Sequence, residues 1–347
     1  MTTQAVGAPR LPSPATLILR GEDVAGLLPM SDCIEAVERA FLRHARGETL
    51  PPAVLGTQVD GGSFHVKTAG LPDGSAAGPV YAAKVNANFP GNPDRHGLPT
   101  IQGAILLFDA ADGRLVALLD SIEITRVRTA AATAVAAKHL APACPSVTIC
   151  GCGGQSRSQL RALACVRPLK RVMALDLRPD RARKFADDMT AELRIDVAVS
   201  DDLAAAARAT DLWVTCTPAQ RWFLGRDHVL PGAFVAAVGA DSPAKQEIEP
   251  ELLASSAVVA DSLEQCAVFG DLHHAIASGL MRREDVRAEL ADVVSGRKRG
   301  RVSPDEIVVF DSTGTALQDV AAATLVYERA VSSGLGLPVQ LGGLQDR

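Results

Sequence analysis

A hydrophobic segment that ends in a cluster of glycines carries the sharpest chemical motif of this sequence. The segment VTIC at 147–150 leads into GCGGQS at 151–156, the order expected for a strand, a tight turn and the start of a helix. Gly151 permits the turn, and Gly153 lets the backbone approach a pyrophosphate held by the N–H groups of the following helix. Ser156 replaces the usual third glycine and is small enough for close helix–strand packing. The motif predicts a dinucleotide site.

An acidic residue at the end of the next hydrophobic segment bears on which dinucleotide binds. The segment RVMALD ends in Asp176, about where a ribose-binding carboxylate belongs. A carboxylate there favours the free 2′-hydroxyl of NAD and repels the 2′-phosphate of NADP, whereas Arg178 is placed to accept that phosphate. The alternative role for Asp176 is that of a solvated residue at a strand end. The sequence favours NAD and leaves NADP open.

A polar face in the first third of the chain offers a site for a small anion. In the segment VYAAKVNANF, the alternation of an extended chain places Lys84, Asn86 and Asn88 on one face. An ordinary half-exposed strand would show the same pattern. If Thr125 caps the alanine-rich helix that follows, Arg128 lies in its first turn, where a cation is unfavourable unless an anion binds beside it. We therefore expect Arg128 to hold a carboxylate through two parallel hydrogen bonds.

A further acid follows a predicted strand later in the chain. Asp241 comes directly after the segment FVAAVGA, at the carboxyl edge of the sheet, where ligands of α/β proteins bind. Its carboxylate could orient an amino group or activate water. Capping of the turn at Pro243 is the alternative role. Asp241 is thus a candidate acid–base residue.

The elements that position these residues are of two kinds. After the strand TLILR and a helix that Ser31 is predicted to cap, strand-like runs follow with short turns at 60–62 and 112–113, which predicts an α+β domain with a largely antiparallel sheet. From about Thr125 onward, strands and helices alternate. This alternation predicts a doubly wound parallel sheet of the Rossmann type. The final helix, TALQDVAAATLVYERAV, could return to the first domain or cap the second.

Composition narrows the class of protein. A length of 347 residues suits two domains, and a net charge of −5 argues against a nucleic-acid surface. The sequence lacks an apolar run of about 18 residues, so we expect no membrane span. Seven cysteines without zinc or disulfide spacing indicate a reducing cytoplasm, and Cys150 and Cys152 are interpreted as packing residues. His273 and His274 lack the spacing of metal ligands, so we expect no metal. Residues 1–16 are expected to form a loose tail.

Six stretches, in order along nearly the whole chain, together resemble the ornithine cyclodeaminase/μ-crystallin family. They are LPMSDCIEAVERAF, the long segment from KVNANFPGN to AKHLA, GCGGQS, VGADSPAKQEI, GDLHHAIASGL and VFDSTGTALQDVAAA. The resemblance implies an α/β fold: an NAD(P)-binding Rossmann domain at 126–314, and an α+β substrate-binding and dimerisation domain at 17–125 plus 315–347. It further implies a homodimer, a C-terminal helix packed on the first domain, and a substrate in a cleft facing the nicotinamide.

The roles of single residues follow from the same resemblance. Lys84 resembles a lysine that contacts the substrate carboxylate and assists proton transfer, Arg128 an arginine that binds this carboxylate, and Thr100 a polar residue of the pocket. Asp241 resembles an acid that handles the substrate amine or water. The positions that match cofactor contacts are Gly151, Gly153, Gly154, Gln155, Ser156, Asp176, Arg178, Thr215, Thr217, Ser312 and Gly314.

One feature of the family is missing from this chain. The family often has an arginine after a proline pair in an early strand, where it serves the substrate carboxylate, but here the pair is followed by Ala53. Lys67 lies where many relatives carry methionine and could supply the missing charge, and His65 shares its face by strand alternation. This difference leaves the substrate open and admits a loss of activity.

Three functions fit these residues. In the first, a hydride moves between NAD(P) and the α-carbon of a small 2-imino or 2-amino acid, such as a cyclic ketimine or the imine of pyruvate. In the second, NAD is a recycled prosthetic group and ornithine or lysine is cyclised with release of ammonia. The third is a crystallin-like binding protein without turnover. The absence of the arginine at Ala53 favours net redox over ornithine cyclisation, and the joint presence of Lys84, Arg128 and Asp241 argues against the third function.

Overall fold

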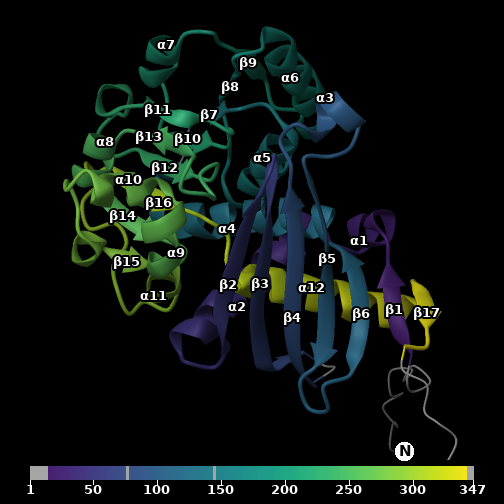
Figure 1. The fold of residues 1–347 in the computed structure, drawn as a ribbon. Coiled ribbons are helices and arrows are strands. Elements are labelled where there is room, and N and C mark those ends of the chain that lie inside the picture. Colours follow the sequence, from purple (N-terminus) through teal and green to yellow (C-terminus); the bar gives the residue numbers. More distant parts are fainter. Residues whose placement is uncertain (1–14, 76–77, 144–145, 342–347) are drawn as a thin grey trace, which may run out of the picture. The chain divides into compact units, whose positions relative to one another are not determined.

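The computed structural model describes residues 15–75, 78–143 and 146–341, and the chain forms two compact units (Figure 1). The first unit comprises the chain up to Ala36, Gly47–Arg128 and the chain from Ala316 onward. The second comprises Val37–Arg46 and Thr129–Thr315. Residues 1–14, most of the predicted tail, and Cys144 lie outside the described residues.

The first unit is built on a seven-stranded sheet with the order β17-β1-β6-β5-β4-β3-β2. Neighbouring strands are antiparallel except β1 and β6, which are parallel. The predicted, largely antiparallel sheet is therefore confirmed. Its strands are β1 (Thr16–Leu19), β2 (Leu50–Val59), β3 (Gly62–Ser75), β4 (Gly78–Asn88), β5 (Ile101–Asp109), β6 (Leu115–Asp120) and β17 (Leu337–Val339).

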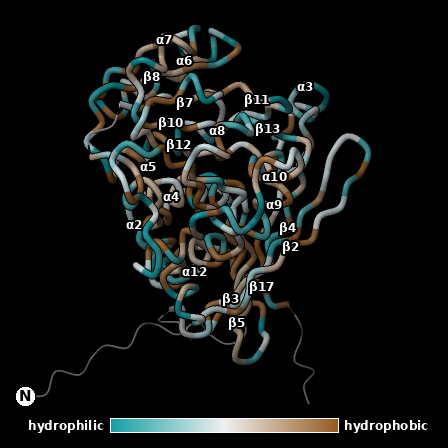
Figure 2. The backbone as a smooth tube through the Cα atoms, turned by 90° about the vertical axis from the view of Figure 1, so that its left-hand side faces the viewer, coloured by the Kyte–Doolittle hydropathy of each residue, from teal (hydrophilic) through white to brown (hydrophobic). Residues whose placement is uncertain are grey.

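The C-terminal helix α12 (Ala316–Ser333) packs across strands β3 and β4 of this sheet (Figure 1). The chain is largely white to brown along α12 in Figure 2, as a buried helix requires. The final helix thus returns to the first unit, which decides between the two positions left open by the sequence. Helices α1 (Gly21–Leu27) and α3 (Asn92–His96) belong to the same unit.

Two predicted helix starts are wrong. Helix α2 (Met30–Ala45) begins before Ser31, and the Ser31 hydroxyl donates to the Asp32 carboxylate instead of capping the helix. Helix α4 (Ser121–Leu140) begins four residues before Thr125. Asp120 accepts the N–H of Ile122 at 2.8 Å and satisfies an early donor of the helix, so Thr125 lies inside it.

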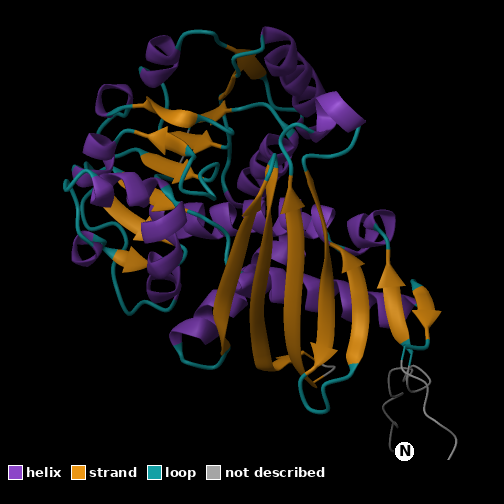
Figure 3. Ribbon diagram, in the orientation of Figure 1, coloured by secondary structure: helices purple, strands orange, loops and turns teal. Residues whose placement is uncertain are grey.

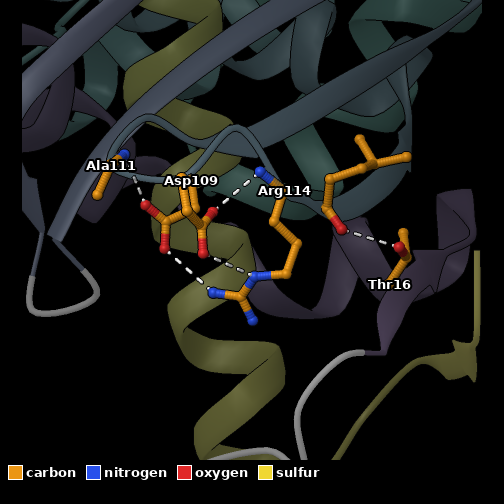
Figure 4. A network of polar contacts seen from close by, with 6 residues as sticks. Thr16, Asp109, Ala111 and Arg114 are labelled. Carbon is orange, nitrogen blue, oxygen red and sulfur yellow. Dashed lines mark hydrogen bonds and ion pairs between the residues drawn. The ribbon is translucent and has the colours of Figure 1, made fainter. Parts of the chain in front are cut away.

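The β5–β6 turn shows how the long strands are joined (Figure 4). Gly113 has a φ of 78°, which an L side chain rarely adopts. Asp109 accepts the N–H of Ala111 at 2.9 Å and forms an ion pair with Arg114 at 3.2 Å. The Thr16 hydroxyl donates to the carbonyl of Leu115 at 2.8 Å and ties β1 to β6. The turn predicted at 112–113 is therefore confirmed.

The second unit contains an eight-stranded parallel sheet with the order β15-β14-β16-β12-β10-β7-β8-β9 (Figure 3). Strand order reverses between β7 and β10, and ligands of such sheets bind at the carboxyl ends beside the reversal. The strands are β7 (Val147–Cys150), β8 (Val172–Leu175), β9 (Val197–Val199), β10 (Leu212–Thr215), β12 (Phe234–Ala237), β14 (Ala257–Ala260), β15 (Ala288–Glu289) and β16 (Val308–Asp311).

Short helices alternate with these strands, as predicted. They are α5 (Gly154–Val166), α6 (Pro179–Leu193), α7 (Leu203–Ala207), α8 (Pro250–Ala254), α9 (Leu263–Phe269), α10 (Asp271–Ala277), α11 (Leu290–Val294) and the 3₁₀ turns η1 (Arg226–His228) and η2 (Arg283–Asp285). A separate pair, β11 (Gln220–Leu224) and β13 (Gln246–Ile248), forms a two-stranded parallel sheet. In the described part of the chain, all helices are too short or too polar to cross a membrane.

Candidate active site

A buried cluster of two cations and one carboxylate lies between the sheet and helices of the first unit. Lys84 projects from β4, and its Nζ lies 2.6 Å from Oδ2 of Asp319 on α12. Arg128 projects from α4, and its Nε lies 2.8 Å from Oδ1 of the same carboxylate. The three side chains are at most 5% exposed. With Lys84 protonated, their formal charges sum to +1, which one carboxylate ligand would neutralise.

Burial and charge set the protonation of this cluster. Burial, followed by the nearby Arg128, lowers the pKa of Lys84 to about 7, although Asp319 acts in the opposite direction. Burial alone would raise the pKa of Asp319, but Arg128 and Lys84 outweigh it and hold this pKa below its usual range. Near neutral pH, Asp319 is therefore an anion while Lys84 readily gains or loses a proton.

Arg128 does not lie in the first turn of its helix as predicted, yet its guanidinium lies beside a carboxylate. Because α4 begins at Ser121, Arg128 lies well inside the helix and not in its first turn. Its Nη1 donates to Oε1 of Gln318 at 2.7 Å, so α12 fixes the guanidinium from two adjacent residues. The anion beside Arg128 is thus a side chain of the protein itself.

The polar face predicted on β4 is present. Lys84 reaches Asp319 on α12, and the Asn86 side-chain oxygen accepts the Ser121 hydroxyl at 2.7 Å, so both side chains project toward helices of this unit. In the antiparallel register, Lys67 lies directly opposite Lys84, and His65 lies opposite Asn86. Directly opposite residues share a face, so β3 adds the Lys67 and His65 side chains to it.

The register of the sheet decides whether Lys67 can replace the arginine that is missing at Ala53. Ala53 pairs with Thr68, whereas Lys67 pairs with Val54, so Ala53 and Lys67 lie on opposite faces of the sheet. Lys67 therefore adds its charge to the Lys84 face and not at the position of Ala53. Thr100 is half-buried just before β5, and its carbonyl accepts the N–H of Phe89 at 2.8 Å.

Gln318 and Asp319 were missed at the sequence level. They interrupt an otherwise apolar run, ALQDVAAATL, in a helix that packs on a sheet. Both side chains are buried, and a buried charge needs a partner of opposite sign. An acid inside such a run was therefore the available signal for a cationic partner.

The glycine loop of the second unit, predicted to bind a pyrophosphate, leaves open space at the start of a helix. Gly151 has a φ of 94°, and a Cβ there would lie 2.7 Å from the Thr217 side chain. A Cβ on Gly153, by contrast, would meet no described atom within 4 Å, so this position faces open space at the N-terminus of α5. The Ser156 hydroxyl donates to the carbonyl of Gly153 at 2.7 Å. Gly154 and Gln155 form the first turn of α5.

Asp176 follows β8 and is tied to the same loop. Its Oδ2 accepts the N–H of Cys152 at 2.8 Å, and its Oδ1 accepts the N–H of Arg178 at 2.9 Å. The Arg178 guanidinium forms an exposed ion pair with Asp180 at 3.0 Å. Burial raises the pKa of the Cys152 thiol to about 12, which fits its interpretation as a packing residue.

Buried acids, also missed at the sequence level, accept hydrogen bonds from the turns at the remaining positions predicted to contact the cofactor. Glu247 accepts both the N–H and the hydroxyl of Thr217, at 2.6 and 2.7 Å. Asp261 accepts the Ser312 hydroxyl at 3.0 Å and the N–H of Gly314 at 2.7 Å. Thr215, at the end of β10, is fully buried. The sequence signal for Asp261 was an acid at the end of the apolar segment AVVAD.

Asp241 follows β12 and belongs to the second unit, whereas Lys84 and Arg128 belong to the first. Its Oδ1 lies 2.6 Å from Nζ of Lys245, and its side chain is 36% exposed. Lys245 in turn donates its N–H to the carbonyl of Ser242, which closes the turn after the strand. Asp241 is thus a paired, accessible carboxylate at the carboxyl end of the parallel sheet.

Comparison with known proteins identifies the family. The model of the ornithine cyclodeaminase/mu-crystallin family matches residues 15–334. This chain belongs to that family. An alanine dehydrogenase of Archaeoglobus fulgidus is 37% identical over 326 residues, which cover 94% of this chain and 98% of that protein.

Two solved structures extend the comparison. An archaeal alanine dehydrogenase dimer with bound NAD superposes with a TM-score of 0.89 and 36% identity, covering 95% of this chain and all of the other (100%). The Δ1-pyrroline-2-carboxylate reductase of Thermococcus litoralis, in complex with NADH and L-proline, has a TM-score of 0.89 and 32% identity, covering 93% of this chain and 100% of that chain.

These similarities confirm the predicted family and the fold class. The chain is an NAD-dependent amino- or imino-acid oxidoreductase of the ornithine cyclodeaminase/mu-crystallin family.

Proposed function

We propose that this enzyme interconverts a small 2-imino acid and the corresponding 2-amino acid, with Lys84 and Arg128 binding the carboxylate of the substrate. The observation that carries the proposal is the +1 charge of the buried cluster, in which two cations share the single carboxylate of Asp319. A substrate carboxylate would complete the charge balance. Arginine and lysine hydrogen bonds to a carboxylate are also stronger than neutral ones.

Lys84 is the proposed proton donor and acceptor at the substrate nitrogen. With a pKa of about 7, it holds a proton below neutral pH and is largely a free amine above it. A group whose pKa lies near the working pH is effective in both directions of proton transfer. Reduction of an imine needs the protonated lysine, so we expect its rate to fall above pH 7, whereas amine oxidation should rise.

The cofactor is NAD(H), and the loop of the second unit is proposed to bind it. The open space beside Gly153 admits a pyrophosphate against the N-terminus of α5, and Asp176 is placed beside the loop to accept a ribose hydroxyl. Bound NADH supplies the hydride that reduces the α-carbon. Gly151, Ser156, Thr217 and the Ser312–Gly314 turn maintain the shape of the loops.

Asp241 is the second residue proposed to handle a proton. Its carboxylate is ion-paired with Lys245 and accessible, so it is suited to orient a substrate amine. Thr100, Lys67 and His65 are proposed to line the substrate side, where Lys67 and His65 extend the polar face of Lys84.

We also propose a homodimer that covers the opposite face of the first sheet. Leu55, Phe64 and Val85 are 67%, 43% and 39% exposed, and the strand register places them on the face away from Lys84. A contiguous apolar face of this kind is typical of a self-association surface. Replacement of Leu55 by Glu should convert the dimer to monomer in analytical ultracentrifugation. A cytoplasmic location remains a prediction.

The decisive experiment follows NADH oxidation with two imine sources, Δ1-pyrroline-2-carboxylate and pyruvate plus ammonia. In parallel, L-ornithine with catalytic NAD is assayed for ammonia and proline. NADH oxidation with an imine supports the proposal. Ammonia and proline without net NADH would replace it with cyclodeamination, and tight NADH binding without any turnover would replace it with a binding role.

A further inference from the structure

We propose that Asp319 is a positioning residue that holds Lys84 and Arg128 at the spacing of a carboxylate and keeps Lys84 able to donate a proton. The inference rests on the proposed function. It starts from one geometric fact: each oxygen of Asp319 contacts a different cation, Lys84 at 2.6 Å and Arg128 at 2.8 Å.

The position of Asp319 leaves it little freedom. It lies near the start of α12, where the helix packs on β3 and β4, and its side chain is 1% exposed. An ionised carboxylate at such a depth is stable only when it is paired. Lys84 and Arg128 come from different elements, β4 and α4, so the carboxylate also links the sheet to the two helices.

The groups around Lys84 make Asp319 the source of negative charge in this cluster. Lys67 faces Lys84 from β3, with His65 two residues further along on the same face, and Arg128 acts on it from α4. Cys33 on α2 is an uncharged thiol at neutral pH, since burial raises its pKa to about 12. From β5, the residue opposite Lys84 is the apolar Ile105.

Removal of the negative charge therefore has a defined sign. Asp319 raises the pKa of Lys84, whereas burial, Arg128 and Lys67 lower it. In an Asp319→Asn variant, Lys84 should lose its proton at a lower pH than in the wild type. The descending limb of imine reduction should then move to lower pH by about one unit or more, which reduces turnover at pH 7.5 on the order of tenfold.

The test compares pH profiles of kcat for imine reduction in four proteins: wild type, Asp319→Asn, Asp319→Glu and Asp109→Asn. Asp319→Glu keeps the charge and should keep the limb near that of the wild type. Asp109→Asn removes a carboxylate that is ion-paired with Arg114 in the same unit, and should leave the limb unchanged. Calorimetric NADH binding shows whether each variant is folded. An unshifted limb in a folded Asp319→Asn enzyme would overturn the proposal.

A binding measurement, which needs no turnover, tests the role of Asp319 independently of the proposed function. Binding of L-proline to the NADH complex is titrated by calorimetry between pH 6 and 9 for wild type and Asp319→Asn. If the wild type fails to reduce any imine, the proposed function fails, and this titration alone decides the role of Asp319. Loss of affinity at lower pH in the variant than in the wild type supports positioning. Identical affinity profiles in the two proteins, or binding of L-proline by neither, overturn the proposal. If Asp319→Asn does not fold, the pH profile of Asp319→Glu decides: a limb near that of the wild type supports the proposal, and a displaced limb overturns it.

Discussion

The two units of this molecule bury carboxylates in opposite ways. In the first, Asp319 is surrounded by cations, which hold its pKa below the usual range. In the second, Asp271 and Asp311 are buried beside each other's charge and accept backbone N–H groups, and burial raises the pKa of Asp271 well above its ordinary value and that of Asp311 to about 7. Burial alone therefore does not set the charge of an acid; its neighbours do.

The difference separates two tasks. The acids of the second unit accept N–H groups of turns, as when Asp271 accepts those of Glu247 and Ile248, so their task is to shape loops. Asp319 organises cations and leaves them with an excess of positive charge. The acids of the second unit thus stabilise the loops proposed to hold the large dinucleotide, whereas the cluster around Asp319 in the first unit attracts a small anion.

The largest expected effect is that of Lys84→Met. Without the ammonium group, Arg128 and Asp319 form a neutral pair, so both the attraction for a carboxylate and the proton donor are lost. We expect kcat/KM for imine reduction to fall by roughly 10³-fold or more, with NADH affinity unchanged. Steady-state kinetics and NADH titration test this. Lys138→Met, which removes an exposed ion pair with Glu38, is the matched control. Normal turnover in Lys84→Met would refute the assignment.

Alanine substitutions at two glycines of the loop should have different effects, one on NADH affinity and the other on stability. Gly153→Ala adds a Cβ into open space, so stability should be kept while NADH affinity falls by roughly 10- to 100-fold, because the methyl group occupies the place of the pyrophosphate. Gly151→Ala places a Cβ 2.7 Å from the Thr217 side chain at a φ of 94°. It should lose about 1–3 kcal/mol of stability. Thermal unfolding and calorimetry distinguish the two. Unchanged NADH affinity in Gly153→Ala would argue against this loop as the binding site.

The two units should also respond oppositely to pH. Folding raises the pKa of Asp311 from 3.8 to about 7, so over this range the folded state binds more protons than the unfolded state, and stability falls as pH rises. Folding lowers the pKa of Lys84 from 10.5 to about 7, so its contribution makes stability rise between these values. In Asp311→Asn, the decline of Tm between pH 5 and 7 should be smaller than in the wild type. Each kcal/mol of pH-dependent unfolding free energy that the substitution removes corresponds to roughly 2–4 °C in Tm. A decline as steep as in the wild type would show that other groups cause it.

The smallest effect is expected for Arg178→Ala. The guanidinium of Arg178 is exposed and paired with Asp180, while Asp176 accepts two backbone N–H groups beside the glycine loop. The preference for NADH over NADPH should therefore change by about twofold or less, since exposed ion pairs contribute little. Ratios of kcat/KM with the two cofactors measure it. A large shift would show that Arg178 does contact the ribose side.

Local patterns predicted much of this structure. The alternation of strands and helices after Thr125 can be read from short segments of the sequence, and it predicted the parallel sheet. The glycine-loop motif is likewise contained in ten consecutive residues, 147–156. The predicted start of α4 was wrong because Thr125 is a good cap by type, but Asp120, five residues earlier, already accepts the N–H of Ile122. The partner of Arg128 could not be found by any local rule, because Gln318 lies 190 residues away and meets it only through the tertiary fold.

The C-terminal position of α12 has a consequence for the order in which the protein folds during synthesis. The whole second unit is translated before Ala316, the first residue of α12, whereas β3 and β4 are translated before Thr129–Thr315, the larger segment of the second unit. Domains fold as units while the chain emerges, and contacts between distant segments form late. The second unit can therefore fold first. Until α12 is synthesised, the sheet of the first unit remains incomplete, and Lys84 and Arg128 lack the carboxylate of Asp319.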